Sequence, residues 1–234
     1  MNKQNIILIP AYEPEDILIK LVKELSKEEF NILIVDDGSG PKYQEIFNKC
    51  AKYAKVISYE PNEGKGYALK TGLKYIKDNY KDPYVIVTMD SDGQHSIKDA
   101  KRLIQECTQN RKALILGKRI RSKKTPLRSR IGNGITRVVY RITTGLDIYD
   151  TQTGLRAFSN ELLDYLLNIE GNRFEYEMNV LLKCAKDKIK MKEIEIETIY
   201  IDNNSGSHFN GIKDSYIIYR DIIKHSLSHK KERK

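Results

Sequence analysis

Short apolar runs alternate with helical patterns through the first half of the chain, and this alternation limits the possible folds more than any other feature. Five runs have the length and β-rich composition of buried strands: 5–10, 31–37, 55–60, 84–90 and 113–117. Helical patterns separate them at 15–27, 42–54, 64–79 and 97–109. Because strands without polar alternation are covered on both faces, the pattern predicts an α/β fold with a mostly parallel sheet flanked by helices.

The second half of the chain does not continue this alternation of strands and helices. Its segments are a basic stretch at 118–130, helical patterns at 131–144, 159–168 and 174–187, a polar stretch at 150–158, and a strand-like run at 192–201. A terminal amphipathic helix carries one apolar stripe, made of Ile212, Tyr216, Tyr219, Ile223 and Leu227. The chain contains no repeat or linker, so we expect one domain at 1–227, elaborated in its C-terminal half, and a basic tail at 228–234.

The composition excludes several classes of protein. A core is possible in a 234-residue chain that is 40% hydrophobic, and no apolar run approaches the roughly 20 residues of a membrane-spanning helix. The N-terminus lacks the pattern of a signal peptide, and the three cysteines form no CxxC pair. These features predict a cytoplasmic protein with reduced thiols.

The formal net charge is +9, and the basic residues are concentrated in two places. From Lys118 to Arg141 the chain carries nine basic residues and no acidic one, and a second cluster closes the chain at 225–234. Such a balance favours anionic partners: nucleotides, phosphorylated lipids, an anionic membrane face or nucleic acid. Nucleic acid is the weakest of these, because the charges do not follow a recognition helix and aromatic RNA-binding motifs are missing.

Polar clusters follow three of the predicted strands, where ligands gather in open α/β sheets. In VDDGS (35–39), Asp36 and Asp37 could form only a turn with a helix cap, or could accept hydrogen bonds from a nucleobase or ribose. In NEGKG (62–66), two glycines allow close backbone approach, and Lys65 presents a positive charge at a helix N-terminus. That loop suits a pyrophosphate, although a purely structural turn is equally compatible with it.

Two aspartates one residue apart end the fourth apolar run, in MDSDGQH (89–95). Asp90 and Asp92 repel each other unless a cation lies between them. Mg²⁺ and Mn²⁺ suit such a pair because they bind oxygen ligands, often one or two carboxylates plus substrate phosphates. Gln94 and His95 could complete the coordination or orient an acceptor. The alternative is a solvated acidic turn.

The order and spacing of IPAY, VDDGS, NEGKG and MDSDGQH resemble the N-terminal half of the inverting family 2 glycosyltransferases, which have the Rossmann-like GT-A fold. Later motifs resemble the branch that contains dolichyl- and polyprenyl-phosphate sugar synthases: GKR (117–119), RSRIGN (128–133), DTQTGLRAF (150–158), NRFEYEMN (172–179) and SGSHF (205–209). The resemblance covers about residues 5–220 and implies a donor-binding half at 1–117 and an acceptor-binding half at 118–227.

The resemblance also implies roles for individual residues. Those expected at the donor nucleotide are Pro10, Tyr12, Glu13, Asp36, Asp37, Lys65, Asp90 and Ser91. Glu13 is included although the chain reads Glu-Pro-Glu where the family often has Asn-Glu. The metal set is Asp90, Asp92 and Gln94, for Mg²⁺ or Mn²⁺. Arg119 and Arg130 match arginines that grip an acceptor phosphate, and Arg128 is a neighbouring candidate.

The implied reaction is inverting transfer of a hexose from a UDP- or GDP-linked sugar to a polyprenyl-type lipid phosphate. The expected catalytic residues are Asp90, Asp92, Asp150, Arg119 and Arg130. A phosphate acceptor is already an anion and needs alignment rather than a base. The alternative acceptor, a hydroxyl of a cell-envelope saccharide, needs a base, for which Asp150 is the candidate.

Gln152 and Arg156 belong to a loop that either positions the acceptor or is structural. The terminal helix and tail could dock on the inner face of an anionic membrane or be solvated. The sequence sets neither the donor base nor the oligomeric state.

Overall fold

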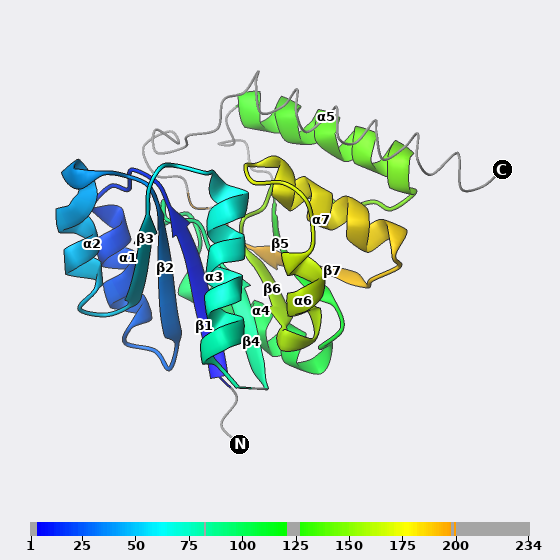
Figure 1. The fold of residues 1–234 in the computed structure, drawn as a ribbon. Helices are drawn as coiled ribbons and strands as arrows, with labels where there is room; N and C mark the ends of the chain where they lie inside the picture. Colours follow the sequence, from blue (N-terminus) through cyan, green and yellow to red (C-terminus); the bar gives the residue numbers. More distant parts are fainter. Residues whose placement is uncertain (1–3, 82, 121–126, 198, 200–234) are drawn as a thin grey trace.

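The computed structural model describes residues 4–81, 83–120, 127–197 and 199, and gives only the backbone course of 127–133. The described residues form one seven-stranded sheet in the order β3-β2-β1-β4-β6-β5-β7 (Figure 1). The strands are β1 Gln4–Ala11, β2 Asn31–Asp37, β3 Lys55–Tyr59, β4 Tyr84–Thr88, β5 Leu114–Arg119, β6 Arg156–Ser159 and β7 Met191–Ile196. The helices are α1 Ile17–Leu25, α2 Gln44–Cys50, α3 Lys65–Asn79, α4 Ile97–Gln109, α5 Leu127–Thr144, α6 Leu163–Leu167 and α7 Glu175–Lys186, with 3₁₀ turns η1 Pro41–Tyr43 and η2 Asn160–Leu162.

The sheet is mostly parallel, as the sequence predicts. β1 pairs in parallel with β2 and β4, and β5 pairs in parallel with β7. β6 is the exception, running antiparallel between β4 and β5. The interpretation of 150–158 as one polar stretch was wrong at its end, because Arg156–Ser159 is a fully buried strand. Four residues beginning with arginine are too short and too polar at their start to be recognised as a strand.

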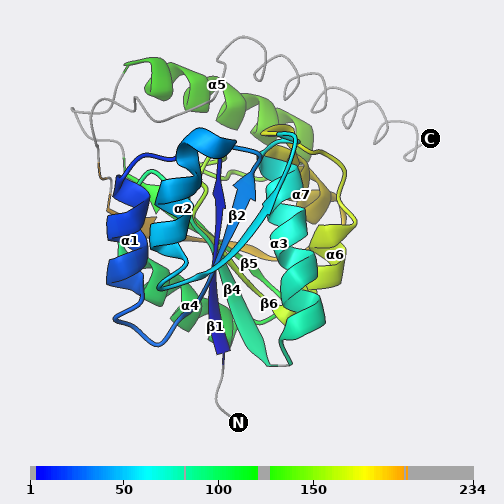
Figure 2. The same ribbon diagram turned by 60° about the vertical axis from the view of Figure 1, so that its left-hand side comes forward.

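Each face of the sheet carries its own apolar core, because neighbouring residues of a strand point to opposite sides. Ile6 and Leu8 of β1 pack toward α3, α6 and α7, whereas Ile7 and Ile9 pack toward α1, α2 and α4. Figure 2 shows these two groups of helices on either side of the strands. Coverage of both faces explains why the strands show no polar alternation in sequence.

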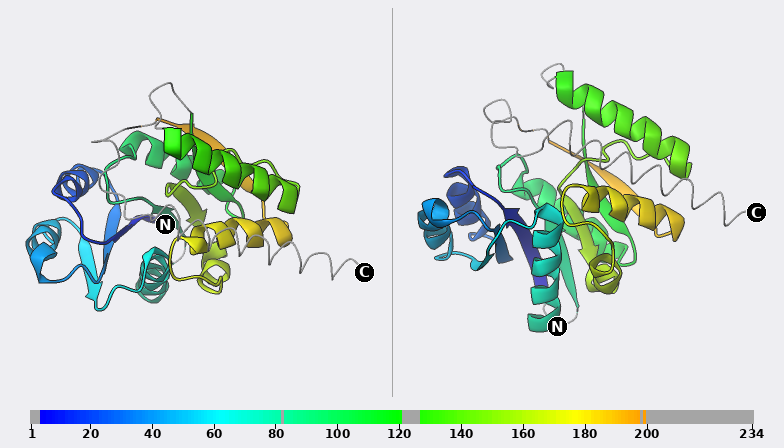
Figure 3. Two further views of the ribbon diagram at one scale, coloured as in Figure 1. Left: turned by 90° about the horizontal axis from the view of Figure 1, so that it is seen from above. Right: turned by 45° about the horizontal axis from the view of Figure 1, so that its top comes forward.

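Helix α5 extends the architecture beyond these layers. It begins at Leu127, four residues before the predicted start, and runs alongside α7 (Figure 3). Tyr140 is fully buried between the two helices, and its hydroxyl donates a hydrogen bond to the Leu181 carbonyl at 3.2 Å. α5 lies on the side toward which β1 and β2 point their carboxyl ends (Figures 1 and 2).

The predicted terminal helix, the SGSHF motif and the basic tail at 228–234 lie outside the described residues. Within the described ranges, no helix combines the length and apolar character that crossing a bilayer requires.

Candidate active site

Asp90 lies just beyond the carboxyl end of β4 and is held by two side chains. Lys65, the first residue of α3, places its Nζ 2.7 Å from Asp90 Oδ1, and His95 Nε2 lies 3.1 Å from Asp90 Oδ2. Burial by itself would raise the pKa of the Asp90 carboxyl. Lys65 and His95 outweigh that effect and hold the pKa well below its usual range. Asp90 is therefore a fixed, ionised carboxylate.

Asp92 is in a different electrostatic state. Its Oδ1 accepts the backbone N–H of Gln94 at 3.0 Å, and in the described part of the chain no lysine or arginine forms an ion pair with it. Burial, followed by the negative charge of Asp90, raises the pKa of Asp92. The pair thus has one compensated acid and one that would gain from an added cation.

Lys65 has a second carboxylate partner, from the other half of the chain. Its Nζ lies 2.9 Å from Oε2 of Glu177, in the first turn of α7, and both side chains are mostly buried. Burial lowers the pKa of Lys65, but Asp90 and Glu177 raise it by more, so the ammonium stays protonated. A continuous chain of charges, Asp90–Lys65–Glu177, therefore joins the loop after β4 to α7.

Gly154 lies directly against the Asp90 carboxylate. A Cβ at this position would be 2.2 Å from Asp90 Oδ2, closer than any side chain can approach. The Thr88 hydroxyl donates to the Gly154 carbonyl at 2.8 Å and so fixes the backbone there. Only glycine lets the segment before β6 pass this close to the acid.

Asp37, predicted at the nucleoside, organises the loop after β3. Its Oδ1 accepts the Tyr59 hydroxyl at 2.8 Å, and its Oδ2 accepts the Asn62 side-chain amide and the Gly64 N–H, each at 2.9 Å. Asp36 Oδ1 accepts the Ser39 N–H at 2.9 Å. Both acids therefore have the turn-forming contacts of the structural alternative.

The two glycines of the NEGKG motif have a packing role. A Cβ on Gly66 would lie 2.5 Å from the Cβ of Tyr176, and one on Gly64 would lie 2.7 Å from the Asn172 carbonyl oxygen. The Tyr67 N–H also donates to that carbonyl at 2.8 Å. The glycines let the N-terminus of α3 lie against the start of α7, which brings Lys65 within reach of Glu177.

The other predicted donor residues lie at the same edge of the sheet. Pro10 is buried near the end of β1, and Tyr12 and Glu13 follow it, half-buried. Burial, and then the neighbouring Glu13, raise the pKa of Tyr12. Glu13 has φ 46°, a left-handed conformation that non-glycine residues rarely adopt. Ser91 and Gln94 are half-buried in the loop after β4, beside Asp90 and Asp92.

Two residues predicted to act on the acceptor pair with each other. Arg119, at the end of β5, donates from Nε to Asp150 Oδ2 at 2.7 Å and from Nη2 to Asp150 Oδ1 at 3.0 Å. Asp150 is almost completely buried, and its Oδ1 also accepts the Gln152 N–H at 3.3 Å. This fork-to-fork contact fixes the guanidinium plane. Both carboxylate oxygens of Asp150 already accept N–H groups.

Arg156 lies inside the molecule, on β6. Its Nε donates to the Thr153 carbonyl at 2.9 Å and its Nη1 to the Glu177 carbonyl at 2.8 Å. Its Nη2 is buried and has no hydrogen-bond partner among the described residues. These contacts fit the structural interpretation of the 150–158 loop, since they tie it to α7. The side chains of Arg128 and Arg130 lie outside the described residues.

The acid pair fits a divalent cation that takes its remaining ligands from a substrate. Across the described ranges, no three His, Cys, Asp or Glu side chains form a ready-made metal cage. The ammonium of Lys65 lies against Asp90, whereas burial, followed by the negative charge of Asp90, raises the pKa of Asp92. Carboxylate and amide oxygens at Asp90, Asp92 and Gln94 are the ligands that Mg²⁺ and Mn²⁺ prefer.

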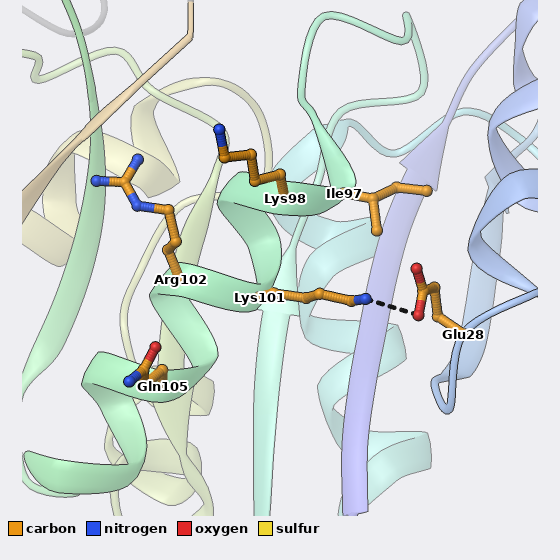
Figure 4. A pocket seen from close by; sticks show the side chains of 6 residues that line it. All are labelled: Glu28, Ile97, Lys98, Lys101, Arg102 and Gln105. Atoms are coloured by element: carbon orange, nitrogen blue, oxygen red, sulfur yellow. Dashed lines mark ion pairs between the residues drawn. The ribbon is translucent and has the colours of Figure 1, made fainter.

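A shallow groove of about 390 Å³ lies elsewhere, on the outer side of α4 (Figure 4). It is lined by Glu28, Ile97, Lys98, Lys101, Arg102 and Gln105. Lys101 extends toward Glu28 and pairs with it at 2.7 Å. The groove shares no residue with the predicted site.

Sequence reasoning did not place Glu177 or Gly154 in this centre. The sequence alone allows Glu177 to be a helix-dipole acid or an acceptor contact, and it gives Gly154 no specific role. The available signals were the second acid of FEYEM (174–178) and the glycine before LRAF (155–158). Neither signal identifies Asp90 or Lys65 as its neighbour.

Comparisons with known proteins show which family and fold the chain resembles. The family model described as "Glycosyl transferase family 2" matches residues 6–167. The UDP-N-acetylglucosamine–dolichyl-phosphate N-acetylglucosaminyltransferase of Methanococcus voltae is 31% identical over 93% of this chain and 94% of its own length. The dolichyl-phosphate β-glucosyltransferase of Saccharomyces cerevisiae is 26% identical over 93% of this chain and 72% of its own.

Among solved structures, glucosyl-3-phosphoglycerate synthase from Mycobacterium tuberculosis, in complex with Mn²⁺, UDP-glucose and phosphoglyceric acid, has the same fold. Its TM-score is 0.70 at 16% identity, with 97% of this chain and 79% of that chain covered. This likeness confirms the predicted GT-A architecture.

Proposed function

The chain belongs to glycosyl transferase family 2, and from that premise we propose that it transfers a hexose from a UDP- or GDP-linked sugar to a polyprenyl-type lipid phosphate. The observation that carries the proposal is the asymmetric acid pair. Asp90 is paired with Lys65 and His95, whereas Asp92 forms no ion pair with a lysine or arginine among the described residues and would gain from an added cation.

Asp90, Asp92 and Gln94 would hold Mg²⁺ or Mn²⁺ together with the donor diphosphate, and the bound ion supplies Lewis-acid neutralisation of the departing nucleoside diphosphate. Lys65 adds a positive charge at the N-terminus of α3, where phosphate oxygens are favoured. Pro10, Tyr12, Glu13, Asp36, Asp37 and Ser91 are the proposed contacts of the nucleotide. Residues 1–117 then form the donor-binding half of the catalytic domain.

The acceptor is proposed to bind in the half formed by 118–227. Arg119 is held by Asp150 in a fixed plane suited to bidentate contact with phosphate oxygens. Arg128 and Arg130, in the first turns of α5, would complete the grip, and Gln152 and Arg156 would support the 150–158 loop. We place Asp150 as the positioning partner of Arg119 rather than as a base, because its carboxylate is almost completely buried and forms a bidentate pair with that guanidinium.

A lipid phosphate is an anion at neutral pH, so the reaction needs no residue to remove a proton from it. Its oxygen attacks the anomeric carbon from the face opposite the leaving diphosphate, and the configuration inverts in one step. Support for a lipid-phosphate acceptor comes from the dolichyl-phosphate relatives named above. The protein would then work from the cytoplasm, at the inner face of the anionic membrane that holds the acceptor.

The test is direct. The purified chain is incubated with polyprenyl phosphate and a panel of UDP- and GDP-sugars, with Mn²⁺ or Mg²⁺, and the anomeric configuration of the product is determined by NMR. A glycosylated lipid phosphate of inverted configuration is expected, and Arg130→Ala should raise the acceptor KM far more than the donor KM. Transfer only to saccharide hydroxyls would instead identify the alternative, a cell-envelope saccharide transferase.

A further inference from the structure

Glu193, on β7, accepts hydrogen bonds from two consecutive backbone N–H groups of the segment between α5 and β6. Its Oε1 lies 2.9 Å from the Tyr149 nitrogen and 3.1 Å from the Asp150 nitrogen. Successive N–H groups that turn toward one oxygen suit an anionic acceptor such as a carboxylate. The Glu193 side chain is half-buried, so these two bonds are partly shielded from water.

Asp150, the second of the two residues that Glu193 holds, is also the residue that holds Arg119. Its carboxylate receives Nε of Arg119 at 2.7 Å and Nη2 at 3.0 Å, and it receives the Arg119 backbone N–H at 3.3 Å. Because an aspartate side chain is short, the position of its backbone determines where its carboxylate can lie. Glu193 therefore acts on the guanidinium plane of Arg119 through Asp150.

The three linked residues come from three separate segments of the chain. Arg119 ends β5, Asp150 lies between α5 and β6, and Glu193 lies on β7, which pairs with β5 at the edge of the sheet. The pairing of β5 with β6 reaches only to Leu116, so beyond that point the Asp150 side chain, and not a strand, receives the Arg119 N–H. Glu193 is the contact from β7 that keeps Asp150 beside the end of β5.

Charge balance is the other role open to Glu193, because Lys118 and Arg137 feel its negative charge. Each of these cations has a closer carboxylate of its own. Lys118 Nζ lies 3.0 Å from Glu195 Oε1, and Arg137 Nη2 lies 2.7 Å from Asp147 Oδ2. Glu193 instead directs its Oε1 to backbone N–H groups, which favours a role set by the position of that oxygen.

We propose that Glu193 is a positioning residue of the acceptor site. It holds Tyr149 and Asp150 in place, so that Asp150 keeps the Arg119 guanidinium in one plane for the acceptor phosphate. The consequence for sugar transfer rests on the proposed function, whereas the positioning of Arg119 does not. Glu193 itself touches no substrate, and the reach of its side chain matters more than its charge.

The first experiment observes the Arg119 guanidinium in the full chain without substrate. The protein is labelled with ¹⁵N-arginine, and the Nε–H resonance of Arg119 is identified by its loss in Arg119→Lys. We expect a slowly exchanging resonance in the parent, because Asp150 accepts this N–H. Glu193→Gln keeps an oxygen acceptor of the same reach and should preserve the resonance.

Two further variants withdraw the acceptor oxygen. Glu193→Asp keeps the charge but is one methylene shorter, and Glu193→Ala removes the carboxylate. In both, the Arg119 Nε–H should exchange about tenfold faster or broaden away, at a temperature well below the thermal midpoint of each variant. The matched control is Glu195→Ala, on the same strand, whose side chain pairs with Lys118; it should leave the resonance unchanged.

Two outcomes of this experiment overturn the inference. One is a parent-like Arg119 resonance in a folded Glu193→Asp or Glu193→Ala variant, which would show that Asp150 needs no support from β7. The other is an equal loss in Glu193→Gln and Glu193→Asp, which would show that Arg119 depends on the charge of Glu193 and on its reach alike.

The second experiment measures steady-state kinetics with polyprenyl phosphate and the sugar donor that the parent uses. Glu193→Asp should raise the acceptor KM by about tenfold and leave the donor KM within about twofold, and Glu193→Gln should stay close to the parent in both. A fall in kcat with both KM values unchanged would overturn the assignment to the acceptor site. If the parent glycosylates no lipid phosphate, the proposed function fails, while the Arg119 resonance still tests the positioning.

Discussion

Lys65 and Glu177 form an ion pair across the two halves of the chain, with Nζ 2.9 Å from Oε2. The same ammonium lies 2.7 Å from Asp90 Oδ1. Glu177 therefore helps to position the Lys65 ammonium. Through Lys65 it affects Asp90, an acid of the proposed metal site that it does not contact directly.

Glu177→Gln should reduce the free energy of unfolding by about 1–3 kcal/mol, because a mostly buried ammonium loses one of two counter-charges while keeping an oxygen acceptor. Urea denaturation measures the change. The control is Glu175→Gln, two residues away, where the half-buried side chain accepts the N–H groups of Asn172 and Arg173 and forms no ion pair with a described residue. Its effect should stay within about 0.5 kcal/mol. Equal losses in both variants would contradict the role given to the Lys65 pair.

Asp90→Asn should lower the stability of the fold, whereas Asp92→Asn should leave it unchanged or raise it. The first takes the Asp90 carboxylate from His95 and leaves Lys65 with Glu177 alone, so the thermal midpoint should fall. The second removes a charge whose pKa is already raised by burial and by Asp90, so the midpoint should stay the same or rise. Both should lower the rate of sugar transfer by about a hundredfold or more. A stability loss in Asp92→Asn as large as that in Asp90→Asn would disprove the asymmetry of the pair.

Stabilisation by metal and nucleotide should depend on Asp92. Mn²⁺ or Mg²⁺ added with UDP or GDP should stabilise the parent chain and so raise its thermal midpoint. At a hundredfold excess of free ligand over Kd, the free energy of unfolding should rise by about 2.7 kcal/mol. A chelator should reverse the metal-dependent part. In Asp92→Asn this part should be absent even though the fold is intact, and a normal metal-dependent shift in that variant would place the ion elsewhere.

Gly154→Ala should lower both nucleotide–metal affinity and activity. The added Cβ would lie 2.2 Å from Asp90 Oδ2, and the carboxylate cannot retreat without leaving Lys65 and His95. Gly134→Ala is the matched control, because its Cβ meets no heavy atom within 4 Å. Within α5 it should be neutral or stabilise the fold by up to about 1 kcal/mol. Calorimetric titration with nucleotide and Mn²⁺ compares the two, and equal affinities would rule out the close contact at Asp90.

Asp150→Asn should act mainly on the acceptor. The asparagine would present one oxygen where Arg119 now meets two, so the guanidinium loses its fixed plane. Steady-state kinetics should show a raised acceptor KM with little change in the donor KM, and Arg119→Lys, which keeps the charge but not the fork, should do the same. A loss confined to kcat at unchanged acceptor KM would instead favour a proton-transfer role for Asp150.

The local pattern of the sequence was enough to predict helix α4, the position of Lys65 at a helix N-terminus and the position of Asp90 and Asp92 at the end of a strand. Helix α4 was expected at 97–109 and occupies Ile97–Gln109, with the Ser96 hydroxyl accepting the Asp99 N–H, because periodicity and an N-cap are properties of neighbouring residues. Lys65 was likewise expected at a helix N-terminus and opens α3. The placement of Asp90 and Asp92 after β4 followed from the end of an apolar run.

The tertiary structure alone decided which of these residues meet. Gly154 approaches Asp90 because β6 is inserted between β4 and β5. Lys65 pairs with Glu177 because α7 packs against α3. Arg156 could be a buried strand residue only because the carbonyls of Thr153 and Glu177 receive its N–H groups. Sequence periodicity is set by neighbours along the chain, whereas contacts between distant residues are set by sheet order and close packing, which the whole chain determines together.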